Sequence, residues 1–382
     1  MNTKGLVLGL AAVCSAAIPA GACTGIALKA KDGSYIQART IEWAKGYLES
    51  GYTIIPRGEK LFSYTPDGGQ GHHFTAKYGV VGLTVADKNF IAEGLNEAGL
   101  STGLFFFPEY GSYTKFDPAR RSVSVADMQL NQWMLSQFAT VDEVKEAILS
   151  GNVDVVGLVG NAVVHWRIGD QSGREVVLEI VDGVPHFYEN PVGVITNAPG
   201  FEWHLTNLSN YVNLYGGTAA PQKMGDFEVQ PIGSGSGLRG VPGDATPPSR
   251  FIRAAFIRNT APQMADAFAT VTQTFHLLNF FDVPLGFETN VGTEFPNIPS
   301  ATQWTSSIDL THKIVYYHTA YNINIRCIDL GTIDFGKVAN QWHPLDERQV
   351  QPVEMVPLAE YNPDTVYPRY GRDVTEDRDQ NL

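Results

Sequence analysis

Residues 20–43 read AGACTGIALKAKDGSYIQARTIEW, and this stretch decides the fold. It holds two runs of extended character, residues 23–29 and 34–39, which are joined by Lys31-Asp32-Gly33. Asp-Gly between two such runs is a strong signal for a β-hairpin. The sequence therefore predicts a hairpin that begins at Cys23, with Arg39 returning beside residues 23–25.

Residues 1–22 have the features of a secretory signal peptide. A basic residue precedes the apolar run of residues 5–18, and Ala20 and Ala22 form the A-x-A arrangement that a signal peptidase accepts. The apolar run is shorter than the ~20 residues that a membrane span needs. We expect cleavage after Ala22 and export of a soluble chain, periplasmic or secreted, that starts at Cys23.

A cysteine after small residues can instead be a lipoprotein attachment site. Such sites usually have Leu at the third residue before the cysteine, where this chain has Ala20. They are usually followed by a polar tether, whereas a strand-like run follows here. The non-enzyme alternative is therefore an exported lipoprotein that binds an apolar ligand.

The composition is that of a core-forming globular chain. Of 382 residues, 43% are apolar and 18% are charged, below the roughly 25% of an average soluble domain. The formal net charge is −13 and no run of Lys or Arg interrupts it, which argues against nucleic acid as a partner. Cleavage after Ala22 would leave two cysteines, too few for a disulfide framework.

Strand-like and helix-like segments alternate in blocks along the chain. The expected strands cover residues 23–29, 34–39, 52–55, 78–85, 90–93, 100–107, 163–168, 175–181, 186–188, 193–196, 313–318 and 323–330. The expected helices cover residues 125–138, 141–149, 250–258 and 264–278, and Thr140 with Glu143 forms a capping box for the second. This order indicates an α+β fold in which helices cover packed sheets.

The C-terminal region differs from the rest in composition. After Phe335 the chain becomes charged and contains prolines. We therefore predict a single domain over residues 23–336 and a C-terminal extension, partly flexible, over residues 337–382.

Familiar cofactor and metal motifs are missing from the sequence. Residues 235–240 fit G-x-G-x-x-G, but Val241-Pro242-Gly243 follows and cannot open the helix that a dinucleotide site needs. There is no H-E-x-x-H and no Cys-x-x-Cys. We expect neither a cofactor nor a metal, and we interpret each lone histidine as a hydrogen-bonded polar residue of the fold.

Cys23 is the residue whose chemistry stands out. Once the leader is removed, it carries a thiol and a free α-amine, whose unperturbed pKa values of ~8.5 and ~7.7–8.0 suit acid–base work near neutral pH. The α-amine can act as the base for its own side chain, so no catalytic histidine is required. Arg39 could supply the cation that a thiolate needs, and Glu42 could orient the α-ammonium. On the residues alone, both could equally be exposed side chains.

Five motifs occur in order along the chain: Cys23-Thr24-Gly25, Arg39-Thr40-Ile41-Glu42-Trp43, EGLNEAGL at residues 93–100, Thr196-Asn197-Ala198-Pro199, and Pro242-Gly243-Asp244 followed by Ser249-Arg250-Phe251. In this order and spacing they resemble the choloylglycine hydrolases, N-terminal nucleophile (Ntn) hydrolases that include bile salt hydrolases and penicillin V acylases. The resemblance spans residues 23–335. It implies a four-layer αββα sandwich of two antiparallel sheets, commonly a homotetramer, that cleaves a linear amide C–N bond.

The resemblance also implies roles for individual residues. Cys23 matches the nucleophile, Arg39 the cation beside its sulfur, Asn197 the side-chain donor of the oxyanion hole and Arg250 a second active-site arginine. Glu42 stands where the family usually has Asp, a carboxylate that holds the α-amine. Phe105 stands where many bile salt hydrolases have Asn and penicillin acylases often have an aromatic residue. The backbone N–H there would be the second oxyanion donor.

For the substrate, we favour glycine- or taurine-conjugated bile salts. The run Leu104 to Phe107, which includes Phe105 and Phe106, offers apolar surface for a steroid together with Tyr110 and Tyr113, although such a stripe is more often core. Penicillin V or an N-acyl-homoserine lactone would suit the same pocket and is the alternative. Because these substrates are anions, Arg39, Arg250 and Arg239 are expected to make the site locally positive.

Overall fold

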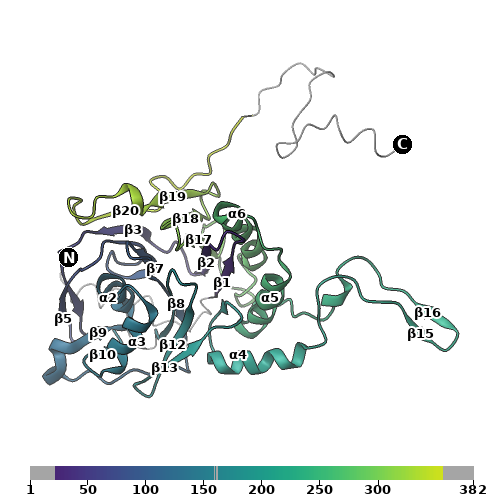
Figure 1. The fold of residues 1–382 in the computed structure, drawn as a ribbon, viewed down its shortest axis with the longest axis horizontal. Coiled ribbons are helices and arrows are strands. Elements are labelled where there is room, and N and C mark those ends of the chain that lie inside the picture. The colour runs from purple at the N-terminus through teal and green to yellow at the C-terminus, as the bar shows by residue number, and fades with distance from the viewer. Residues whose placement is uncertain (1–21, 159, 161, 356–382) are drawn as a thin grey trace. The chain divides into compact units, whose positions relative to one another are not determined.

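The computed structural model describes residues 22–158, 160 and 162–355 (Figure 1). The chain divides into two units, residues 1–350 and residues 351–382, and the fold below is that of the first unit. Apart from Ala22, the expected signal peptide lies outside the described residues.

One sheet is built around the hairpin that the sequence predicts. Its order is β14-β1-β2-β17-β18-β19, and all neighbours are antiparallel. The strands are β1 (Cys23–Lys29), β2 (Tyr35–Glu42), β14 (Val194–Ile195), β17 (Thr302–Asp309), β18 (Ile314–Thr319) and β19 (Arg326–Asp329). The register places Cys23 opposite Ile41 and Gly25 opposite Arg39. Arg39 therefore returns to the start of β1, as predicted.

The second sheet is larger and also antiparallel, with the order β13-β12-β11-β8-β7-β6-β3-β20. Its strands are β3 (Ser50–Ile55), β6 (Val80–Val85), β7 (Ile91–Asn96), β8 (Ser101–Phe106), β11 (Val164–Gly169), β12 (Glu175–Val181), β13 (Val184–Glu189) and β20 (Gln341–Pro344). The described residues also contain three two-stranded sheets, namely β4 (Lys60–Tyr64) with β5 (Gln70–Thr75), β9 (Ser124–Ala126) with β10 (Asp154–Val156), and β15 (Gln222–Met224) with β16 (Phe227–Val229).

Helices cover the outer faces of both large sheets (Figure 1). α5 (Pro247–Thr260) and α6 (Ala267–Leu278) pack on the six-stranded sheet, and α2 (Leu130–Gln137) and α3 (Val141–Leu149) pack on the eight-stranded sheet. α4 (Phe201–Leu208) lies against α5. The inner faces of the sheets share one hydrophobic core. The result is the predicted four-layer αββα sandwich.

Gly25 shows how closely the two sheets approach each other near the start of β1. A Cβ atom there would lie 2.8 Å from the ring of Phe105 on β8 and 2.8 Å from Ile195 on β14. A side chain at this position would therefore displace both neighbours. The glycine allows β1 to pack directly against the second sheet.

Most predicted elements are present within a few residues, and two boundaries need correction. The helix expected over residues 125–138 is wrong in its first turns, because Ser124–Ala126 pair with β10 and α2 begins only at Leu130. The sandwich continues beyond residue 336, where we expected the domain to end, because β20 adds an edge strand to the eight-stranded sheet beside β3.

Several elements were not predicted, above all β17. This strand reads TQWTSSID, yet every residue is buried, because the strand lies in the middle of the six-stranded sheet between β2 and β18. Its Thr and Ser side chains hide the apolar pattern that identifies a buried strand. α4, β20 and the short hairpin β4–β5 were missed as well.

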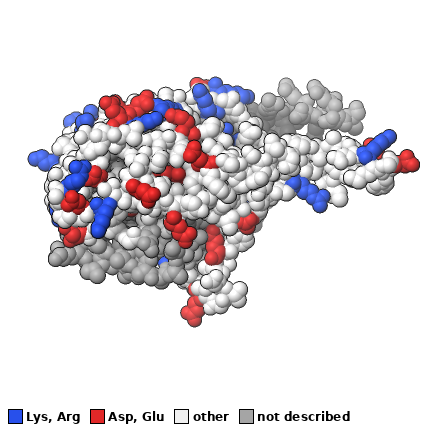
Figure 2. Space-filling model, turned by 90° about the horizontal axis from the view of Figure 1, so that it is seen from below, with Lys and Arg blue, Asp and Glu red and all other residues white. Residues whose placement is uncertain are grey.

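Residues 215–240 form an arm between α4 and α5 that contains the β15–β16 hairpin. In Figure 1 the arm extends away from the layered body of the first unit. Both strands are exposed along their whole length. Figure 2 shows that much of the arm's surface is uncharged, with charged side chains at its tip.

Candidate active site

Cys23 begins β1 and is almost fully buried. Arg250 of α5 fixes the backbone around it: Nη1 donates to the carbonyl of Cys23 at 2.5 Å and to Thr24 Oγ1 at 2.9 Å. The Arg250 Nε donates to the Ala245 carbonyl at 2.8 Å, which anchors the guanidinium to the start of its own helix. The first residue of β1 is thus tied to an outer helix.

Asn197 follows β14 and contacts Cys23 directly. Its Oδ1 accepts the Cys23 N–H at 2.9 Å and Arg250 Nη2 at 2.7 Å, while its Nδ2 donates to the Phe106 carbonyl at 2.8 Å. Because Arg250 can only donate and a carbonyl can only accept, these partners fix which amide atom is oxygen. One N–H of Nδ2 is left for a further acceptor.

Arg39 lies on β2 between the two sheets and is completely buried, so it is not a surface residue. Its Nη1 donates to the carbonyls of Ala92 at 3.1 Å and Leu104 at 2.6 Å, and lies 3.9 Å from Glu93. The guanidinium also stacks 4.3 Å above the ring of Phe105. Its Nη2 is buried and has no hydrogen-bond partner among the described residues.

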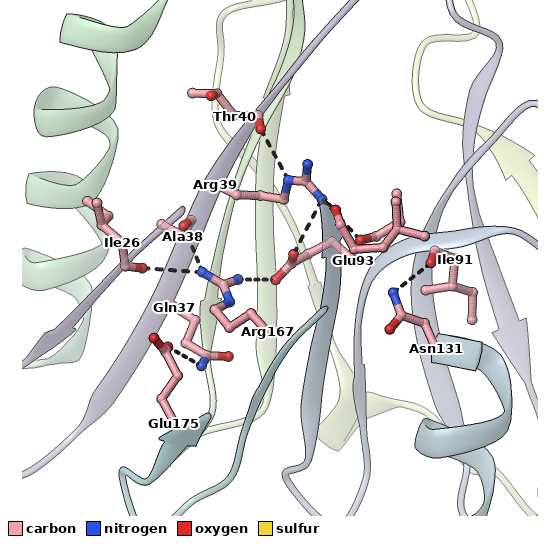
Figure 3. Close-up of polar contacts among 12 residues, drawn as sticks. Ile26, Gln37, Ala38, Arg39, Thr40, Ile91, Glu93, Asn131, Arg167 and Glu175 are labelled. Carbon is pink, nitrogen blue, oxygen red and sulfur yellow. Dashed lines mark hydrogen bonds and ion pairs between the residues drawn. The ribbon is translucent and has the colours of Figure 1, made fainter. Parts of the chain in front are cut away.

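Glu93 connects Arg39 to a second buried arginine (Figure 3). Arg167 on β11 donates through Nη2 to Glu93 at 2.5 Å and through Nη1 to the Ala38 carbonyl at 3.0 Å. Burial raises the pKa of the Glu93 carboxyl, and the two arginines oppose that rise. Strands β2, β7 and β11 are therefore joined by one charged network inside the sandwich.

Glu42 ends β2 and is also buried. Burial raises the pKa of its carboxyl to about 8, and the positive charge of Arg250 opposes this. Its Oε1 accepts from Thr302 Oγ1 at 3.3 Å, while Oε2 is buried without a hydrogen-bond partner among the described residues. In the structure, with Ala22 attached, the Cys23 N–H meets Asn197. The expected contact of Glu42 with a free α-amine stays a prediction.

The charges around Cys23 act on the thiol in opposite directions. Burial raises its pKa, and Arg39 is the strongest opposing influence. Glu42 raises the pKa further, and Arg250 lowers it. Arg239, the third cation that the sequence suggested, lies exposed on the arm at the end of the 3-10 turn Ser236–Leu238. The described site therefore holds two arginines.

The aromatic run on β8 serves mainly as core. Phe105 and Phe107 are fully buried, and Phe107 stacks on His165 at 4.4 Å. Phe107 N–H donates to Val163, which precedes β11, so strand alternation also points the N–H of Phe105 toward β11. The same alternation points the N–H of Phe106 to the opposite edge, where its carbonyl meets Asn197. The backbone donor predicted at Phe105 is thus better placed one residue later.

Sequence reasoning did not assign roles to several residues that hold this site together. Glu93 lies in one of the five motifs but received no role, and Arg167, His165 and His204 were not singled out. The available signal was a charged residue within a strand of otherwise apolar residues. Such a side chain is buried only when it is paired, so it indicates a buried partner elsewhere in the chain. His165 and His204 are each hydrogen-bonded within the fold.

A metal site or a membrane span would each leave a recognisable feature in the described residues. In that part of the chain no cluster of His, Cys, Asp and Glu has the composition to hold a metal ion. No helix there is both long and apolar enough to cross a membrane.

With this geometry in view, comparisons with known proteins decide the family. The family described as linear amide C-N hydrolases, choloylglycine hydrolase family, matches residues 23–341. The chain belongs to this family. The match begins at Cys23, the residue that carries the thiol and begins β1.

The relatives of this choloylglycine hydrolase family member agree with the assignment. It is 34% identical over 314 residues to a bile salt hydrolase/transferase of Clostridium perfringens, covering 81% of this chain and 92% of the relative. It is 27% identical to a penicillin V acylase of Pectobacterium atrosepticum, covering 78% of each. A crystal structure of a mutant conjugated bile acid hydrolase from C. perfringens superposes with a TM-score of 0.75 at 30% identity, covering 88% of this chain and 100% of that one.

These findings establish the chemistry at the level of the family. The protein is an Ntn-type hydrolase of linear amide C–N bonds, similar to bile salt hydrolases, with Cys23 at the start of its domain. An identity of 34% leaves the acyl group and the amine of the substrate open.

Proposed function

We propose that the protein deconjugates glycine- or taurine-conjugated bile salts with Cys23 as the nucleophile. The observation that carries the proposal is the set of contacts that join Cys23, Asn197 and Arg250 in a buried site, within a chain similar to bile salt hydrolases over most of their length. Arg250 and Arg39 also place two cations at the site of a protein whose net charge is −13, which favours anionic substrates there.

The reaction proceeds by two-step acyl transfer. The Cys23 sulfur attacks the amide carbonyl while its α-amine takes the thiol proton and passes it to the leaving amine. The free N–H of Asn197 Nδ2 and the backbone N–H of Phe106 hold the oxyanion. Water then releases the acid from the sulfur. Arg250 holds Asn197 Oδ1, so the amide keeps its N–H directed at the substrate.

Parallel assays of taurocholate, glycocholate and penicillin V with purified mature protein test this proposal. We expect hydrolysis of the two bile salts, none with Cys23→Ala, and a residual rate with Asn197→Ala that is ~10²–10³-fold lower than wild type. Wild-type activity in Cys23→Ala would refute the nucleophile. Exclusive hydrolysis of penicillin V would move the assignment to the alternative below.

A penicillin V acylase or N-acyl-homoserine lactone acylase is the second candidate. The similarity to the P. atrosepticum penicillin V acylase favours it. Phe106, the half-buried aromatic residue of the run on β8, could contact a flat acyl group as well as a steroid. Assays with penicillin V and a long-chain acyl-homoserine lactone separate the two candidates from bile salt hydrolysis.

We also propose that the protein is exported and cleaved after Ala22. The leader pattern supports this, and only cleavage at this bond gives Cys23 the α-amine that the mechanism uses. Mass spectrometry of the mature N-terminus tests the proposal. A free cysteine is the expected result, and a diacylated cysteine would instead support the lipoprotein alternative.

A homotetramer is the proposed assembly. The exposed arm supports it, because Met224, Phe227 and Ile232 are 64%, 70% and 92% exposed, and large apolar side chains on a projecting arm are typical of a surface that another subunit covers. Light scattering of the purified protein gives the mass directly. Replacing Met224, Phe227 and Ile232 together by Ser should lower the mass to that of a smaller species.

A further inference from the structure

Two buried histidines form hydrogen bonds with the backbone at Asn197 and at the residue before it. His204 on α4 lies with Nε2 at 2.9 Å from the Asn197 carbonyl, and His165 on β11 lies with Nε2 at 3.0 Å from the Thr196 carbonyl. A carbonyl oxygen only accepts, so both Nε2 atoms carry the hydrogen. Two consecutive peptide groups are thus held from two different layers of the sandwich.

Each histidine ring is itself held by neighbouring groups. His204 stacks on Phe251 of α5 with ring centres 4.6 Å apart and an interplanar angle of 13°. His165 stacks on Phe107 and directs Nδ1 at Glu179 at 3.2 Å. The same Glu179 oxygen accepts the N–H of Phe201 at 2.8 Å, at the start of the helix that carries His204.

We propose that His204 and His165 are positioning residues that set the orientation of the Asn197 side chain toward the oxyanion. This proposal rests on the proposed function, in which the Asn197 amide stabilises the transition state. Arg250 and the Phe106 carbonyl fix the amide at its outer end, and the histidines fix the peptide groups from which it extends. Neither histidine exchanges a proton with the substrate.

The placement predicts a specific kinetic pattern. Because Asn197 acts on charge that develops in the transition state, loosening its backbone should lower kcat and leave KM nearly unchanged. His204→Phe keeps an aromatic ring beside Phe251 and removes the donor to the Asn197 carbonyl. His204→Gln keeps a donor at about the reach of Nε2. We expect kcat to fall ~10–100-fold in the first and to return within ~3-fold of wild type in the second.

His318 provides a matched control. It is also a largely buried histidine, burial lowers its pKa to about 4 as it does that of His204, and its ring lies 5.1 Å from that of Phe275 of α6. It lies on β18 opposite Thr305 of β17. In the six-stranded sheet, β18 is two strands away from β2, the strand that pairs with Cys23. His318→Phe should therefore leave kcat within ~2-fold of wild type while it perturbs the fold comparably.

A double-mutant cycle with Asn197→Ala separates positioning from general damage. The assay uses whichever of glycocholate, taurocholate and penicillin V the wild-type enzyme hydrolyses. If His204 acts through Asn197, His204→Phe should cost less than ~2-fold in the Asn197→Ala background. An equal loss in both backgrounds, or a loss in His204→Phe that His204→Gln does not rescue, would overturn the proposal. Absence of wild-type activity on all three substrates would instead refute the proposed function.

Discussion

Two buried arginines influence Cys23, and they do so in different ways. Arg250 hydrogen-bonds the nucleophile's own segment, at the Cys23 carbonyl and Thr24, and it also holds Asn197. Arg39 is fixed by carbonyls and Glu93 of the opposite sheet and acts on the thiol through its charge. The site therefore separates placement of the nucleophile, which comes from α5, from stabilisation of the thiolate, which comes from the interior of the sandwich.

The largest expected effect follows from removing the carboxylate on the Arg39 side. Glu93→Gln removes the carboxylate that pairs with both Arg39 and Arg167, and loss of one partner of a buried ion pair typically costs about 3–5 kcal/mol. We expect a loss of that size in the free energy of unfolding, measured by denaturant titration.

Asp67→Asn is the matched control for Glu93→Gln. It breaks the ion pair between Asp67 and Arg121, in which each side chain is at least a third exposed, and exposed pairs contribute little to stability. If both variants lost the same small amount of stability, the carbonyls of Thr40, Ala92 and Leu104 would be enough to hold Arg39. The ion pair with Glu93 would then not distinguish Arg39 from Arg250.

The next largest effect concerns the other arginine. Arg250→Met removes the hydrogen bonds that align Cys23 with Asn197, and a displacement of about 1 Å in such a site can cost ~10²-fold in rate. We therefore expect kcat to fall by about that factor in steady-state assays. Arg253→Met serves as control, because Arg253 lies on the same helix and donates to the carbonyls of Pro242 and Asp244. Its kcat should stay within ~3-fold of the wild-type value.

The sequence predicted the residues around Arg250 better than the contacts that hold Arg39. The hairpin at Asp32-Gly33, the capping of α3 by Thr140 and the apolar run of β12 are local signals, and all three elements appear as expected. Cys23, Asn197 and Arg250 were found because each lies in a short motif. Their mutual contacts then follow from the fold of the family.

The missing parts depend on contacts between distant segments. Nothing local to Glu93 shows that Arg39 and Arg167, on two other strands, converge on it. β17 was missed because Ser and Thr stand where a buried strand usually has apolar residues; the Ser307 hydroxyl, for example, hydrogen-bonds Thr274 of α6, a contact that no local pattern predicts. Likewise, only the ladder between β8 and β11 indicates that the Phe105 N–H points toward β11, which is why Phe106 is the better candidate for the backbone donor.

The third prediction concerns pH and the layer behind Asn197. Burial lowers the pKa of His204 and of His318 to about 4, against 6.5 in the unfolded chain. Between these two pKa values the unfolded state binds more protons than the folded state. The free energy of unfolding therefore keeps its full value above pH 6.5 and decreases as the pH falls toward 4, by on the order of 2 kcal/mol per histidine. His204→Gln should flatten part of this loss in denaturation measured at pH 7, 5.5 and 4.5. A slope equal to that of wild type would show that His204 is already protonated or exposed.

The smallest expected effect is a change in the thiol pKa, and it tests the comparison most directly. Arg39 is the strongest influence that lowers the pKa of Cys23, ahead of Arg250, so Arg39→Met should move the alkylation of Cys23 to higher pH more than Arg250→Met does. The rate of reaction with iodoacetamide against pH gives the midpoint, in a Cys327→Ser background because Cys327 is exposed and would also react. Arg39→Lys retains the charge and should keep a midpoint close to that of the parent. A larger shift of the alkylation midpoint in Arg250→Met than in Arg39→Met would contradict this assignment of roles. The arginine that places the nucleophile would then also be the one that stabilises its thiolate.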